Sequence, residues 1–251
     1  MLKTPLLTKA QIADFARDGY VVVPGAFGAD DAATIERWTR EVTDLPEEPG
    51  KHWVFHEKSS LDGRDLINRI EYIRRFHDGF AALTDILAAP AAQALGEEMV
   101  LFKEKINFKM PGGGGFEPHQ DSQAGWADYA SNFVNVMVCI DAATRENGCL
   151  ELAPGQNRNG LLRGMEPLTP DDIKDMDFIA CPTKPGDIAL FDAYTPHRSD
   201  PNPTDTTRRI YYATYNRAAE GDHLEAYYAD KRRTYPPDIE RVAGREYKYK
   251  V

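Results

Sequence analysis

The segment PGGGGFEPHQD, residues 111–121, is the most informative stretch of this chain for its fold. Four consecutive glycines cannot form the interior of a helix or strand, so residues 111–115 indicate a flexible turn. Pro118 has a fixed φ that suits an extended backbone. In a strand, side chains two residues apart leave the same face. We therefore expect His119 and Asp121 to point together into the mouth of a β-barrel.

Apolar β-rich runs on both sides of this segment support a β fold. The turn signals Asn147-Gly148 and Pro185-Gly186 separate some of them. Short strands at regular spacing are typical of a double-sheet jelly roll, also called a double-stranded β-helix or cupin-like fold. We expect this core to span about residues 99–217. The predicted strands cover residues 100–109, 133–140, 149–152, 187–191 and 209–215.

The N-terminal third predicts helical support for that core. Residues 8–11 have capping-box form, and a short helix should follow and end at Gly19. Residues 20–23 predict a strand. A second helix should begin near Asp30. Helical spacing indicates that these two helices and a third one bury Ile12, Phe15, Ile35, Trp38, Val42, Phe80, Leu83, Ile86 and Leu87. Mainly β with helices is thus the expected fold class.

Two further segments have a less definite character. Residues 44–65 contain Pro46, Pro49, Gly50 and Gly63, which predict a long loop able to fold over a site. We find no repeat, low-complexity segment or linker, so we expect residues 1–251 to form one domain. The role of the tail, residues 218–251, stays open.

Composition limits the partners. The 251 residues carry a net charge of −10, which argues against a nucleic-acid partner. There is no apolar run long enough to cross a membrane and no leader-like start, so we expect a cytoplasmic protein. Cys139, Cys149 and Cys181 lack paired metal-ligand spacing, and we expect buried reduced thiols.

His197 lies far downstream of His119 and Asp121. Two imidazoles and one carboxylate can bind one face of Fe(II) and leave the other face open for a co-substrate and dioxygen. The spacing of His119 and Asp121 is common by chance, and each histidine has a structural alternative, a polar strand residue or a turn cap. Together the three residues indicate an oxygenase. For His52, His56, His77 and His223 we expect no role.

Four motifs occur in an order that resembles the phytanoyl-CoA dioxygenase family of Fe(II)/2-oxoglutarate oxygenases: residues 18–25, 119–121, 146–155 and 185–197. The resemblance covers about residues 8–217. It implies iron ligands at His119, Asp121 and His197. It also implies that Arg208 binds the distal carboxylate of 2-oxoglutarate, with Ser199 as its hydroxyl partner.

The segment 105–109 is similar to the strand that ectoine hydroxylases place under the co-substrate. This similarity nominates Asn107 and Lys105 as cofactor-binding residues. The chain departs from the family at residues 156–158, where Gln-Asn-Arg replaces the frequent Ser-His after Pro-Gly. Since Asp121 is present, no ligand position is vacated for halide, and a halogenase is disfavoured.

Two residue assignments each have a competing alternative. Strand alternation sends one of Arg208 and Arg209 inward and the other outward, and the spacing from His197 favours Arg208. Trp126 either lines the pocket or packs in the core, and the sequence does not decide between these alternatives.

The substrate is indicated only indirectly. The odd-numbered residues of the strand 100–109 should share one face. Lys103, Lys105 and Lys109 then form either a solvated charged face or a local positive field, and a field would favour an anionic substrate. Further polar contacts are nominated at Gln120, Glu71 and Asn68. We expect a small anionic or zwitterionic metabolite, with an aminoalkylphosphonate such as 2-aminoethylphosphonate as the candidate.

Alternative functions remain open at this stage. An amino-acid or ectoine-like molecule is an alternative substrate. A non-catalytic binder or sensor on the same fold is a different class of function, although it would not need a 2-oxoglutarate clamp. An isomerase or hydrolase with another metal would need no oxygen. The oligomeric state is not indicated.

Overall fold

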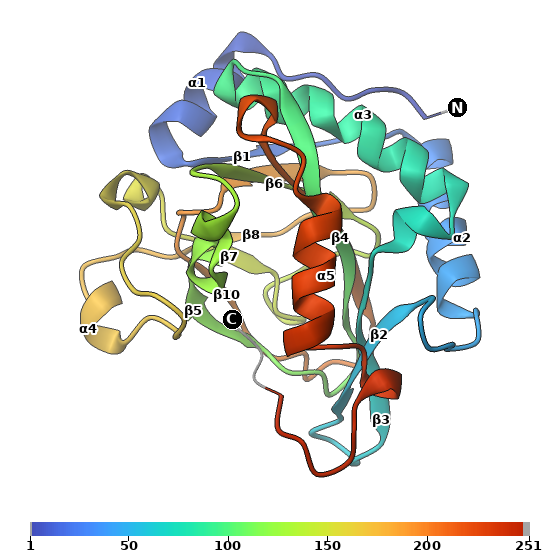
Figure 1. The fold of residues 1–251 in the computed structure, drawn as a ribbon. Helices are drawn as coiled ribbons and strands as arrows, with labels where there is room; N and C mark the ends of the chain where they lie inside the picture. Colours follow the sequence, from blue (N-terminus) through green and yellow to red (C-terminus); the bar gives the residue numbers. More distant parts are fainter. Residues whose placement is uncertain (1, 248–251) are drawn as a thin grey trace.

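Two antiparallel sheets form the core of the protein in a computed structural model that describes residues 2–247 (Figure 1). The larger sheet has seven strands in the order β1-β9-β6-β11-β4-β3-β2. Their bounds are Tyr20–Val23 for β1, Ile188–Asp192 for β9, Phe133–Cys139 for β6, Arg208–Arg217 for β11, Met99–Lys109 for β4, Asp65–Glu71 for β3 and Trp53–Lys58 for β2.

The smaller sheet has four strands in the order β5-β10-β7-β8. They are β5 (Phe116–His119), β10 (His197–Ser199), β7 (Leu150–Leu152) and β8 (Ile179–Cys181). Apolar side chains from both sheets meet between them, among them Met137, Phe191, Leu150 and Leu152. The expected jelly roll is therefore confirmed.

Three helices cover the outer face of the larger sheet, as expected: α1 (Lys9–Asp18), α2 (Ala29–Thr43) and α3 (Asp78–Leu95) (Figure 1). Thr8 and Gln11 form the predicted capping box of α1, and Gly19 ends the helix with φ +77°. Phe80 and Leu83 are fully buried in the same cluster as Val134 and Val136 of β6. Apolar burial, rather than helix propensity, fixes these helices on the sheet.

The prediction of a long loop over residues 44–65 is wrong. The segment contains β2, which pairs with β3 and extends the larger sheet. Prolines and glycines flank this strand, but Trp53 and Phe55 are buried against Tyr228 and Tyr235 from the C-terminal region. The contacts that stabilise β2 come from far along the chain.

The prediction that the odd-numbered residues of the strand 100–109 share one face is wrong at Leu101. Opposite β11, Lys103 pairs with Thr214 and Leu101 pairs with Tyr215, so Phe102 is an extra residue in a β-bulge. Beyond the bulge the alternation is reversed. Leu101 joins the outer core under the helices, whereas Phe102 packs with Trp126 and Phe133.

The C-terminal helix α5 (Leu224–Thr234) lies across the front of the barrel in the view of Figure 1. Its Tyr228 stacks on Tyr72 with ring centroids 3.8 Å apart. The helix α4 (Pro170–Ile173) is a single turn. The three cysteines are buried and free, as predicted. Within residues 2–247, no helix has the length and apolar character needed to cross a bilayer.

Candidate active site

His119, Asp121 and His197 converge at one end of the smaller sheet. His119 ends β5, His197 begins β10, and the two residues pair across the strands. Their Nε2 atoms lie 3.8 Å from Asp121 Oδ1 and 3.9 Å from Asp121 Oδ2, respectively. One ligand atom of each residue lies within 4.8 Å of the others, a geometry that can hold a metal ion.

Asp121 does not lie on the strand with His119, contrary to expectation. It is the first residue of the 3-10 helix η2 (Asp121–Ala124). Strand alternation therefore does not explain why the two side chains converge. The chain turns after Gln120, and the turn itself brings the carboxylate beside the imidazole.

Backbone carbonyls orient both imidazoles. His119 Nδ1 lies 2.7 Å from the carbonyl oxygen of Glu117, and His197 Nδ1 lies 2.9 Å from that of Thr195. A carbonyl oxygen can only accept a hydrogen bond, so Nδ1 carries the hydrogen and each Nε2 keeps its lone pair for a metal. Burial and the neighbouring His197 lower the pKa of His119 to about 3, which keeps the ring neutral.

A polar pair behind Asp121 was missed in the sequence analysis. Asn135 of β6 donates from Nδ2 to Asp121 Oδ2 at 2.9 Å, and Thr214 of β11 donates to Asn135 Oδ1 at 2.6 Å. Both are buried polar residues in apolar strands. The signal in the sequence that could have identified each of them is an isolated polar residue at an inward-facing position of a strand.

The triad opens into a cavity of about 570 Å³, including its open mouth. Residues of both sheets line it. They include Lys103, Lys105, Asn107, Phe116, Asn135, Leu150, Phe191, Ser199, Arg208 and Tyr212. Lys105 and Asn107 of β4 line the same cavity as the triad.

Arg208 lines one end of the cavity, and the basic side chain of Lys109 is buried beside it. They face each other across β11 and β4. Lys109 Nζ donates to Ser199 Oγ at 2.8 Å, and Arg208 Nε has no hydrogen-bond partner among the described residues. No carboxylate forms an ion pair with either cation within residues 2–247. Burial and the neighbouring Arg208 lower the pKa of Lys109 to about 7. A buried arginine without an ion pair fits an anion such as the distal carboxylate of 2-oxoglutarate.

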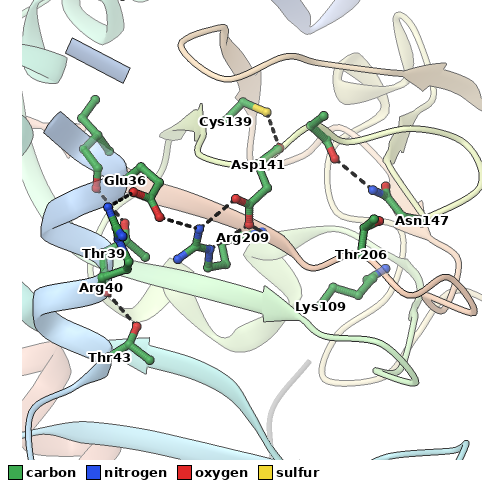
Figure 2. A network of polar contacts seen from close by, with 12 residues as sticks. Glu36, Thr39, Arg40, Thr43, Lys109, Cys139, Asp141, Asn147, Thr206 and Arg209 are labelled. Carbon is green, nitrogen blue, oxygen red and sulfur yellow. Dashed lines mark hydrogen bonds and ion pairs between the residues drawn. The ribbon is translucent and has the colours of Figure 1, made fainter. Parts of the chain in front are cut away.

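Arg209 points away from this cavity, which settles the choice between the two arginines. Figure 2 shows its guanidinium between Asp141 and Glu36 on the outside of the sheet. Its Nε lies 2.8 Å from Asp141 Oδ2, and its Nη2 lies 3.2 Å from Glu36 Oε1. Arg208 is therefore the inward residue.

Trp126 and Gln120 do not line the cavity. Trp126 packs on Phe102 and Phe133, and its ring lies 4.6 Å from Lys103 Nζ. Gln120 is fully buried, and its amide donates to the carbonyls of Gly160 and Tyr194 while accepting from the Leu162 N–H. The expected substrate contact of Gln120 is not supported, because its hydrogen bonds hold a neighbouring loop.

Residues 156–158, where Gln-Asn-Arg replaces the frequent Ser-His of the family, have a structural role. Arg158 donates to the carbonyls of Ala16 and Arg17 at the end of α1. Asn157 donates to Asp192, with 3.4 Å between Nδ2 and Oδ2. These side chains attach α1 to the barrel and are absent from the residues that line the cavity.

A second cavity adjoins the first and shares His119 and Phe116 with it. Its other walls are Phe55, His56, Asn68, Arg69, Gly115, Glu117, Pro167 and Tyr235. Asn68, nominated above for a polar contact, lines this outer cavity. Glu71 lies deeper, in an ion pair with Lys231 of α5.

The chain is similar in sequence and in fold to known dioxygenases. A family model for phytanoyl-CoA dioxygenase matches residues 15–210. The chain is 36% identical over 245 residues to a 2-aminoethylphosphonate dioxygenase of the uncultured bacterium HF130_AEPn_1, covering 96% of this chain and 93% of that protein. It is also 36% identical over 246 residues to a methylphosphonate hydroxylase of Gimesia maris, with the same coverage.

Among solved structures, EctD from S. alaskensis with 2-oxoglutarate and 5-hydroxyectoine superposes with a TM-score of 0.74. It shares 24% identity, and the match covers 85% of this chain and 77% of that one. The fold and the His-Asp-His cluster define a jelly-roll oxygenase. The chain belongs to the phytanoyl-CoA dioxygenase family and is an Fe(II)- and 2-oxoglutarate-dependent dioxygenase.

Proposed function

We propose that this dioxygenase hydroxylates a small phosphonate, with 2-aminoethylphosphonate as the candidate substrate. Two relatives that act on phosphonates, each aligned over 96% of this chain, support the proposal. The cations that line the cavity near the triad supply the matching chemistry. When bound, iron, 2-oxoglutarate and dioxygen hydroxylate an unactivated C–H bond, with release of succinate and carbon dioxide.

His119, Asp121 and His197 are proposed as the iron ligands. A metal ion held by these three side chains would face the cavity on its remaining side, as a facial arrangement of two imidazoles and one carboxylate requires. Burial disfavours protonation of His119, and Asn135 orients Asp121. The three side chains are thus prepared for a metal before it binds.

Arg208 and Ser199 are proposed to bind the distal carboxylate of 2-oxoglutarate. Ser199 Oγ accepts a hydrogen bond from Lys109, so its own hydrogen is available to an acceptor in the cavity. Arg208 can donate two parallel hydrogen bonds to a carboxylate, which a lysine cannot do. Asn107 and Lys105 lie between this end and the triad and are proposed to contact the remainder of the co-substrate.

The observation that carries the substrate proposal is the charge at the opposite side of the cavity. Lys103 lines it near the triad, and Arg69 lines the adjoining outer cavity. A phosphonate is a compact anion with three oxygen acceptors. It would be held by these cations while its carbon lies toward the metal site.

A succinate-release assay tests the proposal. Enzyme with Fe(II) and 2-oxoglutarate is offered 2-aminoethylphosphonate, methylphosphonate or ectoine, and the product is examined for one added oxygen atom. We expect substrate-dependent succinate with a phosphonate and none in the His119→Ala variant. Succinate release with ectoine alone, or an active His119→Ala variant, would contradict the proposal.

A further inference from the structure

Gln120 lies in the sequence between two of the proposed metal ligands, His119 and Asp121, but its side chain points away from the cavity. Its backbone is extended, with φ −115° and ψ 133°, and successive side chains of an extended backbone leave opposite faces. The side chain is fully buried and is not among the residues that line either cavity. Its role must therefore come from the groups that it binds.

Three backbone groups bind the side-chain amide of Gln120. Its Nε2 donates to the carbonyl oxygen of Tyr194 at 2.6 Å and to that of Gly160 at 2.8 Å. Its Oε1 accepts from the Leu162 N–H at 2.8 Å. Both amide hydrogens and the amide oxygen thus have partners. These partners lie 40 to 74 residues further along the chain, so one side chain joins segments that the sequence keeps far apart.

The contact with Tyr194 connects Gln120 to the third proposed ligand, His197. The carbonyl oxygen of Thr195, the residue that follows Tyr194, lies 2.9 Å from His197 Nδ1 and orients the imidazole. Gln120 therefore holds the stretch of backbone that sets the direction of the His197 ring. All three proposed ligands lie within three residues of a group in this bridge.

The strands alone give this end of the site little support. β5 has four residues, β10 has three, and the register between them is irregular. His119 and His197 form the pair at one end of this short ladder. Beyond that pair, the two segments are joined by the side chain of Gln120 and by a backbone hydrogen bond of 3.2 Å from Ser122 to Ala193.

We propose that Gln120 is a positioning residue for the metal site, which sets the spacing of His119 and Asp121 relative to His197 by bridging their segments. The inference rests on the proposed iron ligands. The bridge is neutral, so it fixes geometry without changing the charge at the metal. Asn135 acts differently, since it binds an oxygen of Asp121 directly.

Gln123 offers a matched control for this role. It has the same side chain, is 1% exposed, and lies in η2 beside Asp121. Its Oε1 accepts from the Gln120 N–H at 2.6 Å, and its Nε2 donates to the carbonyl of Glu166 in the neighbouring loop. Removing the Gln123 amide would release that loop but leave the bridge from Gln120 to Tyr194 in place.

Calorimetric titration with Fe(II) in the absence of oxygen tests the proposal. Gln120→Met keeps the length and neutrality of the side chain but removes its hydrogen bonds, and we expect Fe(II) affinity to fall about tenfold. In Gln123→Met the loss should stay below about threefold, since the bridge remains. The absorption bands of bound Co(II), which report coordination geometry, should change in Gln120→Met and not in Gln123→Met. If Gln120→Met does not fold, Gln120→Asn replaces it, because its amide is one methylene too short to reach all three backbone groups.

Equal losses of Fe(II) affinity in the variants of Gln120 and Gln123 would overturn the proposal, because the loop and not the bridge would then support the metal. Unchanged affinity in the Gln120 variant would also overturn it. His119→Ala separates this result from failure of the proposed ligands. If His119→Ala binds Fe(II) as tightly as the wild type, the ligand assignment is wrong and the inference fails with it. If His119→Ala loses Fe(II) while the Gln120 variant keeps it, the ligands stand and only the inference is wrong.

Discussion

Asn135 Nδ2 donates a hydrogen bond to Asp121 Oδ2 at 2.9 Å and thereby fixes the carboxylate that faces both histidines. Asn135 is itself held by Thr214, whose hydroxyl donates to Asn135 Oδ1 at 2.6 Å. The candidate metal site is therefore supported from the larger sheet, although its histidines lie on the smaller one.

The first prediction concerns this support. Asn135→Ala should weaken Fe(II) binding by about 10- to 100-fold, because a hydrogen bond to a metal ligand orients that ligand and tunes its basicity. Thr214→Val should have a smaller effect in the same direction, since it removes only the outer hydrogen bond. Metal titration followed by calorimetry measures both changes. Unchanged metal affinity in Asn135→Ala would show that Asp121 needs no such support.

The second prediction uses the adjacent arginines. Arg208→Lys should weaken 2-oxoglutarate binding by at least about tenfold, because lysine lacks the planar fork for a carboxylate. Arg209→Lys is the matched control and should leave this affinity unchanged, since Arg209 binds Asp141 outside the barrel. The measurement is the dissociation constant of 2-oxoglutarate. Equal losses in both variants would contradict the assignment.

The third prediction tests the amine of the candidate substrate. Glu117 is exposed and lines the outer cavity beside His119. Glu117→Gln should raise the KM for 2-aminoethylphosphonate about two- to fivefold, the effect of a solvent-exposed ion pair. The KM for methylphosphonate, which has no amine, should stay the same. A parallel change for both substrates would argue against an amine contact.

The fourth prediction concerns Glu104, which is fully buried under the helices. Burial raises its pKa from 4.5 to about 8. The folded protein therefore retains a proton that the unfolded chain loses above about pH 4.5. Between about pH 4.5 and 8, this group should lower the free energy of unfolding as pH rises, by up to about 1.4 kcal/mol per pH unit.

Glu104→Gln should remove that contribution. The difference in unfolding free energy between the variant and the wild type, measured by urea denaturation at several pH values, should grow in favour of the variant up to about pH 8 and then level off. The other titrating groups are present in both proteins, so their contributions cancel in this difference. Parallel pH profiles would show that Glu104 is ionised in the folded protein.

The fifth prediction concerns Gly148, which has φ +73° and closes the turn beside Lys109. A Cβ atom there would lie 2.0 Å from the carbonyl oxygen of Asp200. Gly50→Ala is the control, because Gly50 has φ +83° but open space around it, so it should cost about 1 kcal/mol of backbone strain. Gly148→Ala should cost about 1 to 3 kcal/mol more, because the neighbouring backbone must move. Equal melting temperatures for the two variants would contradict this expectation.

Much of the fold could be predicted because its signals are local. Capping residues and apolar spacing indicated α1, and alternating apolar runs bounded by turns indicated β4, β6, β9 and β11. The prediction failed where distant contacts decide the conformation. Strand β2 depends on aromatic residues of the C-terminal region, and the bulge at Phe102 reverses the face of Leu101.

The amino-acid sequence alone indicates the chemical types at the site: two imidazoles, one carboxylate, an arginine and a run of lysines, in an order that resembles one oxygenase family. Which of these side chains meet depends on the folded chain. The tertiary structure turns Gln120 and Trp126 away from the cavity, brings Asn135 to Asp121, and places Lys231 beside Glu71. A buried polar group requires a partner, and its position in the chain does not specify which distant residue supplies one.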